Sequence, residues 1–226
     1  MTDQKVAIVT GAGSGIGRAT SIDLASRGFH VVLVGRTESK LNETASLANG
    51  GTIEVVDICQ SDQCHDLIKR TSRIDAIANV AGAAPMLPIE KVNDATWRTV
   101  IDTNLSAVVN LTAAAWPKLN SGTVVNVSSM ASIDPFPGLA IYAAAKAGLN
   151  MFTRCTAQEG QAIGLKAVGV APGAVETPML RSLFDEQTIP RDKTLDPADV
   201  ARVICDCITG DREFESGETI VVPSPA

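Results

Sequence analysis

The sequence is poor in histidine, aromatic residues and positive charge. Among its 226 residues are two histidines and one tyrosine, and aromatic residues make up 4% of the chain. The formal net charge is −6, which argues against a nucleic-acid partner, because a nucleic-acid-binding surface needs a basic stripe. No apolar run approaches the roughly 18 residues of a membrane-spanning helix, so we expect no membrane partner.

Cysteines are few and widely scattered. Their odd number favours a reduced, cytoplasmic setting over a disulfide framework, and the N-terminal M-T-D-Q-K leads directly into an apolar strand, so we expect no secretory signal. The cysteines lack further ligands at a recognised metal-binding spacing, so we expect core-filling thiols and no metal site. They are Cys59, Cys64, Cys155, Cys205 and Cys207.

The two histidines do not suggest hydrolytic catalysis. His30 precedes a predicted strand, at the edge of the sheet away from the expected ligand, and His65 stands beside Cys64. A Ser-His-Asp arrangement is therefore not expected.

Apolar runs alternate with helical patterns along the whole chain, which has a hydrophobic content of 45%. The length fits one domain over residues 1–226. Repeated strand–helix–strand units predict an α/β fold, a doubly wound parallel sheet with helices on both faces. The expected strands are 5–10, 31–34, 53–56, 74–80, 123–127, 165–170 and 218–222. The expected helices are 16–28, 38–48, 61–70, 94–119, 140–163 and 197–207.

A glycine-rich turn, T-G-A-G-S-G-I-G, joins the first strand to the first helix. Its glycines, Gly11, Gly13, Gly15 and Gly17, permit tight turning and close backbone approach. The helix N-terminus beyond them offers N–H groups and a positive dipole end to a diphosphate. The pattern is neither G-x-G-x-x-G nor a P-loop. A plain glycine loop is the alternative interpretation.

The end of the second strand favours NADP(H) as cofactor, with NAD(H) possible. Dinucleotide folds that bind NAD(H) carry Asp or Glu near this position, whereas an arginine accepts a 2′-phosphate. Here Gly35, Arg36 and Thr37 follow the strand and no carboxylate is present. A solvated arginine is the alternative.

Tyr142 and Lys146 stand four residues apart in Y-A-A-A-K, so both can face one ligand from a helix. A nearby ammonium favours the phenolate and is expected to lower the pKa of the tyrosine. Tyr142 could then exchange a proton with a carbonyl or alcohol oxygen. A surface tyrosine beside a solvated lysine is the alternative.

Two further polar residues complete the candidate chemistry. Ser129 follows a strand end and could hydrogen-bond the substrate oxygen, with Ser128 as the competing assignment. Asn104 lies within a predicted helix, where asparagine is a mediocre helix former. It could break the backbone ladder and hold a water for proton relay, or be a buried amide with satisfied hydrogen bonds.

These motifs together resemble those of the short-chain dehydrogenase/reductase family, over nearly the whole chain. The shared patterns are the T-G-x-x-x-G-x-G turn, T-N-L around Asn104, N-V-S-S ending at Ser129, and Y-x-x-x-K. The resemblance implies a Rossmann-like fold and an Asn-Ser-Tyr-Lys tetrad. In that tetrad Tyr142 is the acid/base, Ser129 orients the carbonyl, Lys146 holds the nicotinamide ribose and Asn104 holds the relay water.

The resemblance also implies the residues that contact the cofactor. Asp57 matches the position that contacts adenine, and Thr177, in P-G-A-V-E-T-P-M, lies near the nicotinamide carboxamide. The expected cofactor-binding set is Gly11, Gly13, Ser14, Gly15, Ile16, Gly17, Arg36, Asp57, Ile58, Asn79, Ala81, Gly82, Tyr142, Lys146, Pro172, Gly173, Val175 and Thr177.

Several positions depart from the family pattern. Val80 and Val168 stand where the family usually has asparagine, and the C-terminal V-V-P-S-P-A lacks the common V-D-G-G. Residues 179–193 occupy the place of the family's substrate lid and are short. A short lid indicates an open site, or a small or partner-supplied substrate boundary.

The sequence thus predicts an NADP(H)-dependent oxidoreductase that interconverts a carbonyl and a secondary alcohol on a small molecule. The stretch Y-A-A-A-K-A-G-L resembles 3-oxoacyl-carrier-protein reductases, and also sugar and steroid enzymes, so it does not name the substrate. A redox sensor that binds NADP(H), and a lyase or epimerase with bound cofactor, are the alternatives. The resemblance further implies a homotetramer or homodimer, paired through the predicted helices 94–119 and 140–163.

Overall fold

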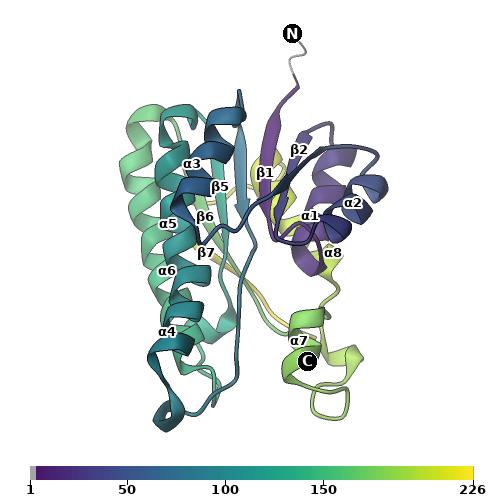
Figure 1. The fold of residues 1–226 in the computed structure, drawn as a ribbon, viewed down its shortest axis with the longest axis vertical. Coiled ribbons are helices and arrows are strands. Elements are labelled where there is room, and N and C mark those ends of the chain that lie inside the picture. The colour runs from purple at the N-terminus through teal and green to yellow at the C-terminus, as the bar shows by residue number, and fades with distance from the viewer. Residues whose placement is uncertain (1–3, 226) are drawn as a thin grey trace.

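A computed structural model describes residues 4–225, and seven parallel strands form its single sheet (Figure 1). The strand order is β3-β2-β1-β4-β5-β6-β7. The chain therefore winds outward from β1 to β3, then returns to place β4 against the other side of β1. The strands are β1 (Val6–Thr10), β2 (His30–Gly35), β3 (Thr52–Val55), β4 (Ala76–Asn79), β5 (Thr123–Val127), β6 (Lys166–Pro172) and β7 (Thr219–Val222).

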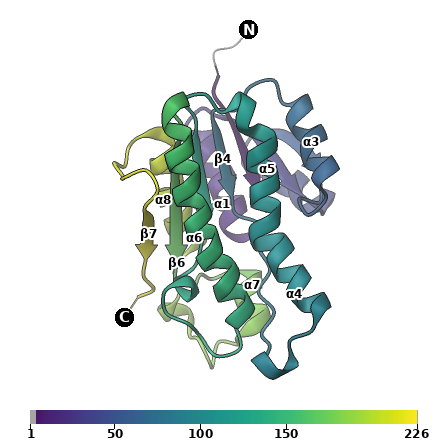
Figure 2. The ribbon, with the colours of Figure 1, turned by 90° about the vertical axis from the view of Figure 1, so that its left-hand side faces the viewer.

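Helices cover both faces of the sheet (Figures 1 and 2). One layer contains α1 (Gly15–Ser26), α2 (Glu38–Leu47) and α8 (Pro197–Thr209). The other contains α3 (Ser61–Arg70), α4 (Asp94–Ile101), α5 (Ala107–Ala115) and α6 (Ala140–Gly160). The doubly wound parallel α/β fold predicted from the sequence is confirmed.

Alternate residues of the strands serve the two layers. In β1, Ile8 belongs to the apolar cluster that includes Leu67 of α3 and Leu111 of α5. Its neighbour Val9 belongs to the cluster on the opposite face with Leu24 of α1. All of these side chains are buried. Burial on both faces explains why the strands read as continuous apolar runs.

The predicted helix over residues 94–119 is divided in the structure. After α4, a π-helical turn, η2 (Asp102–Ser106), precedes α5, and a 3-10 turn, η3 (Trp116–Lys118), follows it. The first interruption contains Asn104, where a break in the ladder was expected. The second contains Pro117, which cannot donate a backbone hydrogen bond.

The structure also contains short elements that the sequence analysis missed. The most important is α7 (Pro178–Leu183), within the predicted lid. The others are the 3-10 turns η1 (Ile89–Lys91), η4 (Met130–Ser132), η5 (Gln161–Ile163) and η6 (Arg191–Lys193). Across residues 4–225, no helix is both long and apolar enough to cross a bilayer.

Candidate active site

The glycine turn after β1 is too closely packed for side chains. A Cβ atom added to Gly17 would lie 2.2 Å from the carbonyl oxygen of Gly11. At Gly11 the φ angle is +68°, and an added Cβ would lie 3.0 Å from the Ala81 backbone. The turn therefore needs glycine both for conformation and for contact with the segment that follows β4.

The turn also leaves hydrogen-bond donors open at the start of α1. The first amides of a helix have no intrahelical acceptor, and the side chain of the N-cap residue, Ser14, accepts no hydrogen bond. No acidic residue occupies the first turn. Free N–H groups at a positive helix end fit the diphosphate of a dinucleotide.

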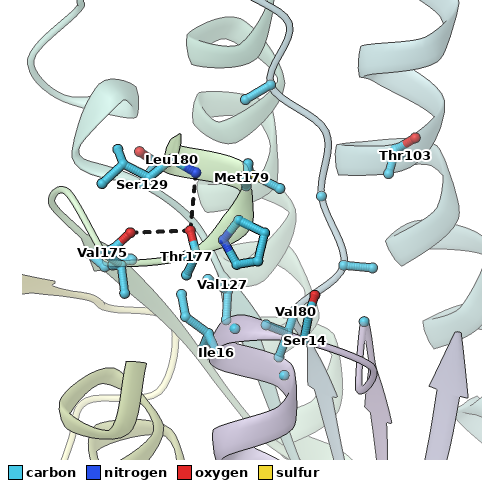
Figure 3. A pocket seen from close by; sticks show the side chains of 18 of the residues that line it. Ser14, Ile16, Val80, Thr103, Val127, Ser129, Val175, Thr177, Met179 and Leu180 are labelled. Carbon is cyan, nitrogen blue, oxygen red and sulfur yellow. Dashed lines mark hydrogen bonds between the residues drawn. The ribbon is translucent and has the colours of Figure 1, made fainter. Parts of the chain in front are cut away.

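A cavity of about 530 Å³ lies over this turn, and segments from the carboxyl ends of the strands line it (Figure 3). Ser14, Ile16 and Val80 lie at one side of the view, and Ser129, Met179 and Leu180 at the other. The lining includes all of the predicted site residues except Asn79 and Asn104. Thr37, Lys40 and Cys59 also line it and were not predicted from the sequence.

Two cations stand at the cavity beyond the end of β2. Arg36 and Lys40 both line the cavity and are exposed. Neither side chain has an ion-pair or hydrogen-bond partner within residues 4–225. Asp57, which follows the adjacent strand β3, also lines the cavity, and its Oδ1 accepts a hydrogen bond from the Cys59 amide at 3.0 Å. This end of the cavity can therefore offer positive charge to a ligand.

Tyr142 and Lys146 both reach the cavity from the first turns of α6. The Nζ of Lys146 lies 5.7 Å from the centroid of the tyrosine ring. It is buried and donates a hydrogen bond of 2.7 Å to the carbonyl oxygen of Val127. Burial lowers the pKa of Lys146 from 10.5 to about 7.

The predicted lowering of the Tyr142 pKa by Lys146 is wrong for this structure. Burial raises the pKa of the phenol, and only its hydrogen bond with Ser129 opposes that rise. The spacing in the sequence indicates that the two groups are near each other, but it does not reveal their desolvation. A buried amine with a pKa near neutrality carries less than a full charge, so it favours the phenolate weakly.

Of the two candidate serines, Ser129 is the one that interacts with the phenol of Tyr142. Its Oγ also accepts a hydrogen bond from the Ala131 amide at 3.1 Å, at the start of η4. Ser128 is buried, and its hydroxyl is directed to the carbonyl oxygen of Lys146, at 3.4 Å. The geometry thus favours Ser129 for contact with a substrate oxygen.

Asn104 is fully buried beneath the cavity wall. Its Nδ2 donates to the carbonyl oxygens of Ala83, at 2.7 Å, and Val100, at 2.8 Å. Its Oδ1 accepts from the Ala83 amide at 3.3 Å. The side chain therefore ties the π-helical turn to the segment after β4, as a satisfied buried amide would.

Asn79 is likewise buried in the sheet. Its Nδ2 donates to the Oδ1 of Asn126 at 2.8 Å, and Asn126 in turn donates to the Oγ1 of Thr153 in α6. This chain of hydrogen bonds fixes α6 to β4 and β5. The structure places Asn79 behind the cavity wall.

Thr177 connects the glycine turn to the lid. An added Cβ at Gly15 would lie 3.0 Å from the Cγ2 of Thr177. The Oγ1 of Thr177 caps α7 by accepting a hydrogen bond from the Leu180 amide at 3.2 Å (Figure 3). Thr followed by Pro is typical of a helix start, with Thr as the N-cap and Pro in the first turn, but this helix was not predicted from the sequence.

The described residues contain no group of three or more His, Cys, Asp or Glu that could hold a metal ion. Cys205 and Cys207 are buried in α8, and burial raises the pKa of Cys207 to about 11. They fill the core of the α1 and α8 layer.

Comparisons with known proteins agree with this geometry. The sequence model of the short chain dehydrogenase family matches residues 5–188. The 3-oxoacyl-[acyl-carrier-protein] reductase of Synechocystis sp. is 36% identical, over 88% of this chain and 87% of that protein. The 3-oxoacyl-[acyl-carrier-protein] reductase FabG of Thermotoga maritima is 31% identical, over 96% and 95%.

An uncharacterized oxidoreductase of Staphylococcus epidermidis is also 31% identical, over 97% of both chains. Among solved structures, a short chain dehydrogenase/reductase family protein superposes with a TM-score of 0.90 and 29% identity, covering 97% of this chain and 95% of that one. The motifs, the fold and the similarity over nearly the whole length agree: the chain belongs to the short-chain dehydrogenase/reductase family of nicotinamide-dependent oxidoreductases.

Proposed function

We propose that this protein is an NADP(H)-dependent oxidoreductase that interconverts a carbonyl and a secondary alcohol. The observation that supports this most directly is the shared cavity. Tyr142, Ser129 and Lys146 line the same space as the glycine turn and the open first turn of α1. A proton donor therefore faces the part of the cavity where the nicotinamide of a bound dinucleotide would lie.

Ser129 and Tyr142 have different roles in the proposed carbonyl reduction. When NADPH is bound, it would supply the hydride that the carbonyl carbon accepts. Ser129 donates a hydrogen bond to the carbonyl oxygen and orients it. Tyr142 gives its proton to that oxygen as negative charge develops there, so that the product is the neutral alcohol. In the reverse direction Tyr142 accepts the proton from the alcohol.

Lys146 and Asn104 act behind these two groups. Lys146 would hold the ribose hydroxyls next to the nicotinamide, and a positive charge on it stabilises the phenolate left on Tyr142. Asn104 is proposed as a positioning residue: its buried amide is bonded to Ala83 and Val100 and holds the wall beside Lys146 in place. An added Cβ on Gly82 would lie 2.9 Å from the Oδ1 of Asn104 and 3.9 Å from the Nζ of Lys146.

The preference for NADP(H) is supported by the two cations beyond β2. Arg36 and Lys40 line the cavity where the 2′-phosphate of the adenosine ribose would lie, and neither is paired with a described carboxylate. Arginine forms bidentate hydrogen bonds with phosphate. NAD(H) lacks that phosphate and would bind more weakly.

Three properties of the whole protein remain predictions from the sequence: one domain over residues 1–226, a homotetramer or homodimer, and a cytoplasmic location. All five cysteines are free in the structure, although they include the exposed Cys155. Free thiols are usual in a reducing compartment.

The first test concerns Tyr142. We expect Tyr142→Phe to lower kcat by about 100- to 10,000-fold, because it removes the general acid, while the dissociation constant for NADPH changes little. The assay follows NADPH consumption with a panel of ketones, aldehydes, diketones and acyl thioesters. NADPH binding without turnover of any panel member would favour the redox sensor.

The second test concerns Arg36. We expect Arg36→Ala to weaken NADPH binding by roughly ten- to a hundredfold and NADH binding hardly at all, because a hydrogen bond to a charged group is worth about 1.5–3 kcal/mol. Arg98→Ala, in the exposed Arg98–Asp94 pair of α4, is the matched control. Tighter NADH than NADPH binding by the unaltered protein would overturn the cofactor assignment.

A further inference from the structure

The cavity wall beyond Ser129 and Tyr142 is apolar. Its members come from the loop between η4 and α6, from α7, and from the segment after α7. Phe136 is 47% exposed and Met179 is 38% exposed. Large apolar side chains open to a cavity mouth indicate a ligand that covers them. This apolar wall consists of Phe136, Leu139, Met179, Leu183, Phe184 and Ile189.

Two aromatic rings join the two sides of the apolar wall. Phe136 and Phe184 stand edge to face, with ring centroids 5.3 Å apart and an interplanar angle of 84°. Phe184 immediately follows α7, whereas Phe136 precedes α6. The pair therefore fixes the short lid against the catalytic side of the cavity and presents ring surface to whatever enters.

Charge on this side of the cavity is limited to one carboxylate. Apart from Lys146 in the catalytic group, the charged lining residues Arg36, Lys40 and Asp57 lie beyond the ends of β2 and β3, at the cofactor side. Asp134 is the charged lining residue beside the apolar wall. Asp134 is exposed, and its carboxylate has no hydrogen-bond or ion-pair partner within residues 4–225.

The arginines of the lid are engaged elsewhere. Arg181 donates from Nε to Glu176 at 2.9 Å and from Nη1 to the carbonyl oxygen of Ile189 at 2.7 Å. Arg191 is paired with Glu186 at 2.8 Å. Neither arginine lines the cavity. An anionic group on a substrate would therefore meet Asp134 and no available cation beside the apolar wall.

From these observations we propose that the substrate is an uncharged, apolar carbonyl compound, and that Asp134 and the apolar wall determine this specificity. The inference rests on the proposed reductase function and names its substrate class. It excludes carboxylates and phosphate-bearing pantetheine thioesters as preferred substrates. It thus separates this chain from the carrier-protein thioester reductases to which it is similar.

The test compares substrates that share one ketone. Neutral ethyl 3-oxobutanoate, the 3-oxobutanoate anion and acetoacetyl-coenzyme A are reduced with saturating NADPH, and kcat/KM is measured for each. We expect the kcat/KM of the neutral ester to exceed that of each anion by about fivefold or more, since unit charges a few ångströms apart in a wet site interact by about 1 kcal/mol or more. Ethyl 3-oxohexanoate should exceed the shorter ester by about threefold for each added methylene that the wall covers.

Two variants assign the effect to residues. Asp134→Lys should narrow the ratio of neutral to anionic substrate by about three- to tenfold, because the sign of the local charge is reversed. Glu213→Lys makes the same charge change on an exposed residue outside the cavity lining and should leave the ratio unchanged. Phe184→Ala should remove most of the gain from the longer chain, and Phe184→Leu should keep more of it.

The outcomes separate the two proposals. The proposed substrate class is overturned if kcat/KM is highest for acetoacetyl-coenzyme A or the carboxylate. It is also overturned if Asp134→Lys does not change the ratio of kcat/KM for the neutral ester to kcat/KM for the anions. Either result leaves the reductase function standing. Reduction of none of these ketones or the wider panel, with NADPH binding intact, overturns both.

Discussion

Lys146 is a buried amine whose hydrogen-bond acceptor is a carbonyl oxygen instead of a carboxylate. That arrangement satisfies one donor but provides no opposite charge, so desolvation decides the pKa, which falls to about 7. Near neutral pH the side chain is divided between its charged and neutral forms. A polar group brought next to Lys146 would shift that balance, and with it the support available to the Tyr142 phenolate.

Because the pKa of Lys146 is lowered in the folded state, the free energy of unfolding of the cofactor-free protein depends on pH. Between about pH 7 and 10.5 the unfolded chain binds a proton at Lys146 that the folded chain does not. Stability from this residue therefore falls as the pH is lowered through that window, by at most about 1.4 kcal/mol per unit, and is level below it. Lys146→Met removes the amine and should remove this slope.

The measurement is the free energy of unfolding by denaturant at several pH values between 7 and 10, for both proteins. The difference between the two proteins isolates Lys146, because every other titrating group is shared. Parallel curves across the window would show that the amine keeps its ordinary pKa.

At the level of elements, the π-helical turn between α4 and α5, over Asp102–Ser106, carries the side chain of Asn104. Its side-chain amide donates to the carbonyl oxygen of Val100, one turn earlier, and bonds both backbone polar groups of Ala83. π-Turns of this kind are frequent at functional sites. Here the turn carries a helix residue to the loop that borders Lys146.

Asn104→Ala should therefore destabilise the fold as well as reduce activity. It removes the side-chain donor to the buried carbonyl oxygen of Val100 and to the half-buried one of Ala83, at a cost of about 1–3 kcal/mol for a buried group left unsatisfied. Asn110→Ala, on a residue of α5 whose side chain makes no hydrogen bond within residues 4–225, is the matched control. Chemical denaturation measures both variants, and equal stabilities would refute the bracing role.

The sequence predicts elements well where a long apolar period dominates. β5 and α3 have the expected bounds, and the other strands differ by one or two residues at most ends. The break near Asn104 was expected because asparagine sits poorly in a helix. In contrast, α7 has six residues, which is too short for a helical period to be recognised.

The sequence alone predicted the parts of the site that lie close together in the chain, but not the contacts between distant segments. Glycine spacing and Y-x-x-x-K identify groups that are close in the chain, so the turn and the Tyr142–Lys146 pair could be anticipated. The contact between Phe136 and Phe184 joins distant segments, and no local pattern indicates it. The direction of the Tyr142 pKa shift depends on burial, which is a property of the folded cavity.

For the whole molecule, the outer faces of α5 and α6 determine the expected assembly. Met151 of α6 is 53% exposed, and the neighbouring positions Ala144 and Ala147 are exposed small residues. Small residues allow two helices to approach closely, and an exposed methionine provides apolar area to bury. Both properties suit a helix that pairs with its copy across a two-fold axis.

Met151→Glu should therefore lower the molecular mass found by light scattering at micromolar concentration, from a dimer or tetramer toward the monomer. A buried charge at the centre of the pair would be uncompensated. Leu47→Glu, on a residue of α2 that is 54% exposed, is the control and should keep the original mass. A monomeric mass for the unaltered protein would contradict the assembly itself.

Tyr142 is the sole tyrosine of the chain. Phenol and phenolate differ in their ultraviolet spectra, and the two tryptophans do not titrate in this way. A spectrophotometric pH titration therefore reads the protonation of one side chain, the proposed proton donor, without label or substitution. The midpoint of the absorbance change gives the pKa of the Tyr142 phenol. Comparing the midpoint in the folded protein with that in the unfolded chain measures how much burial raises this pKa.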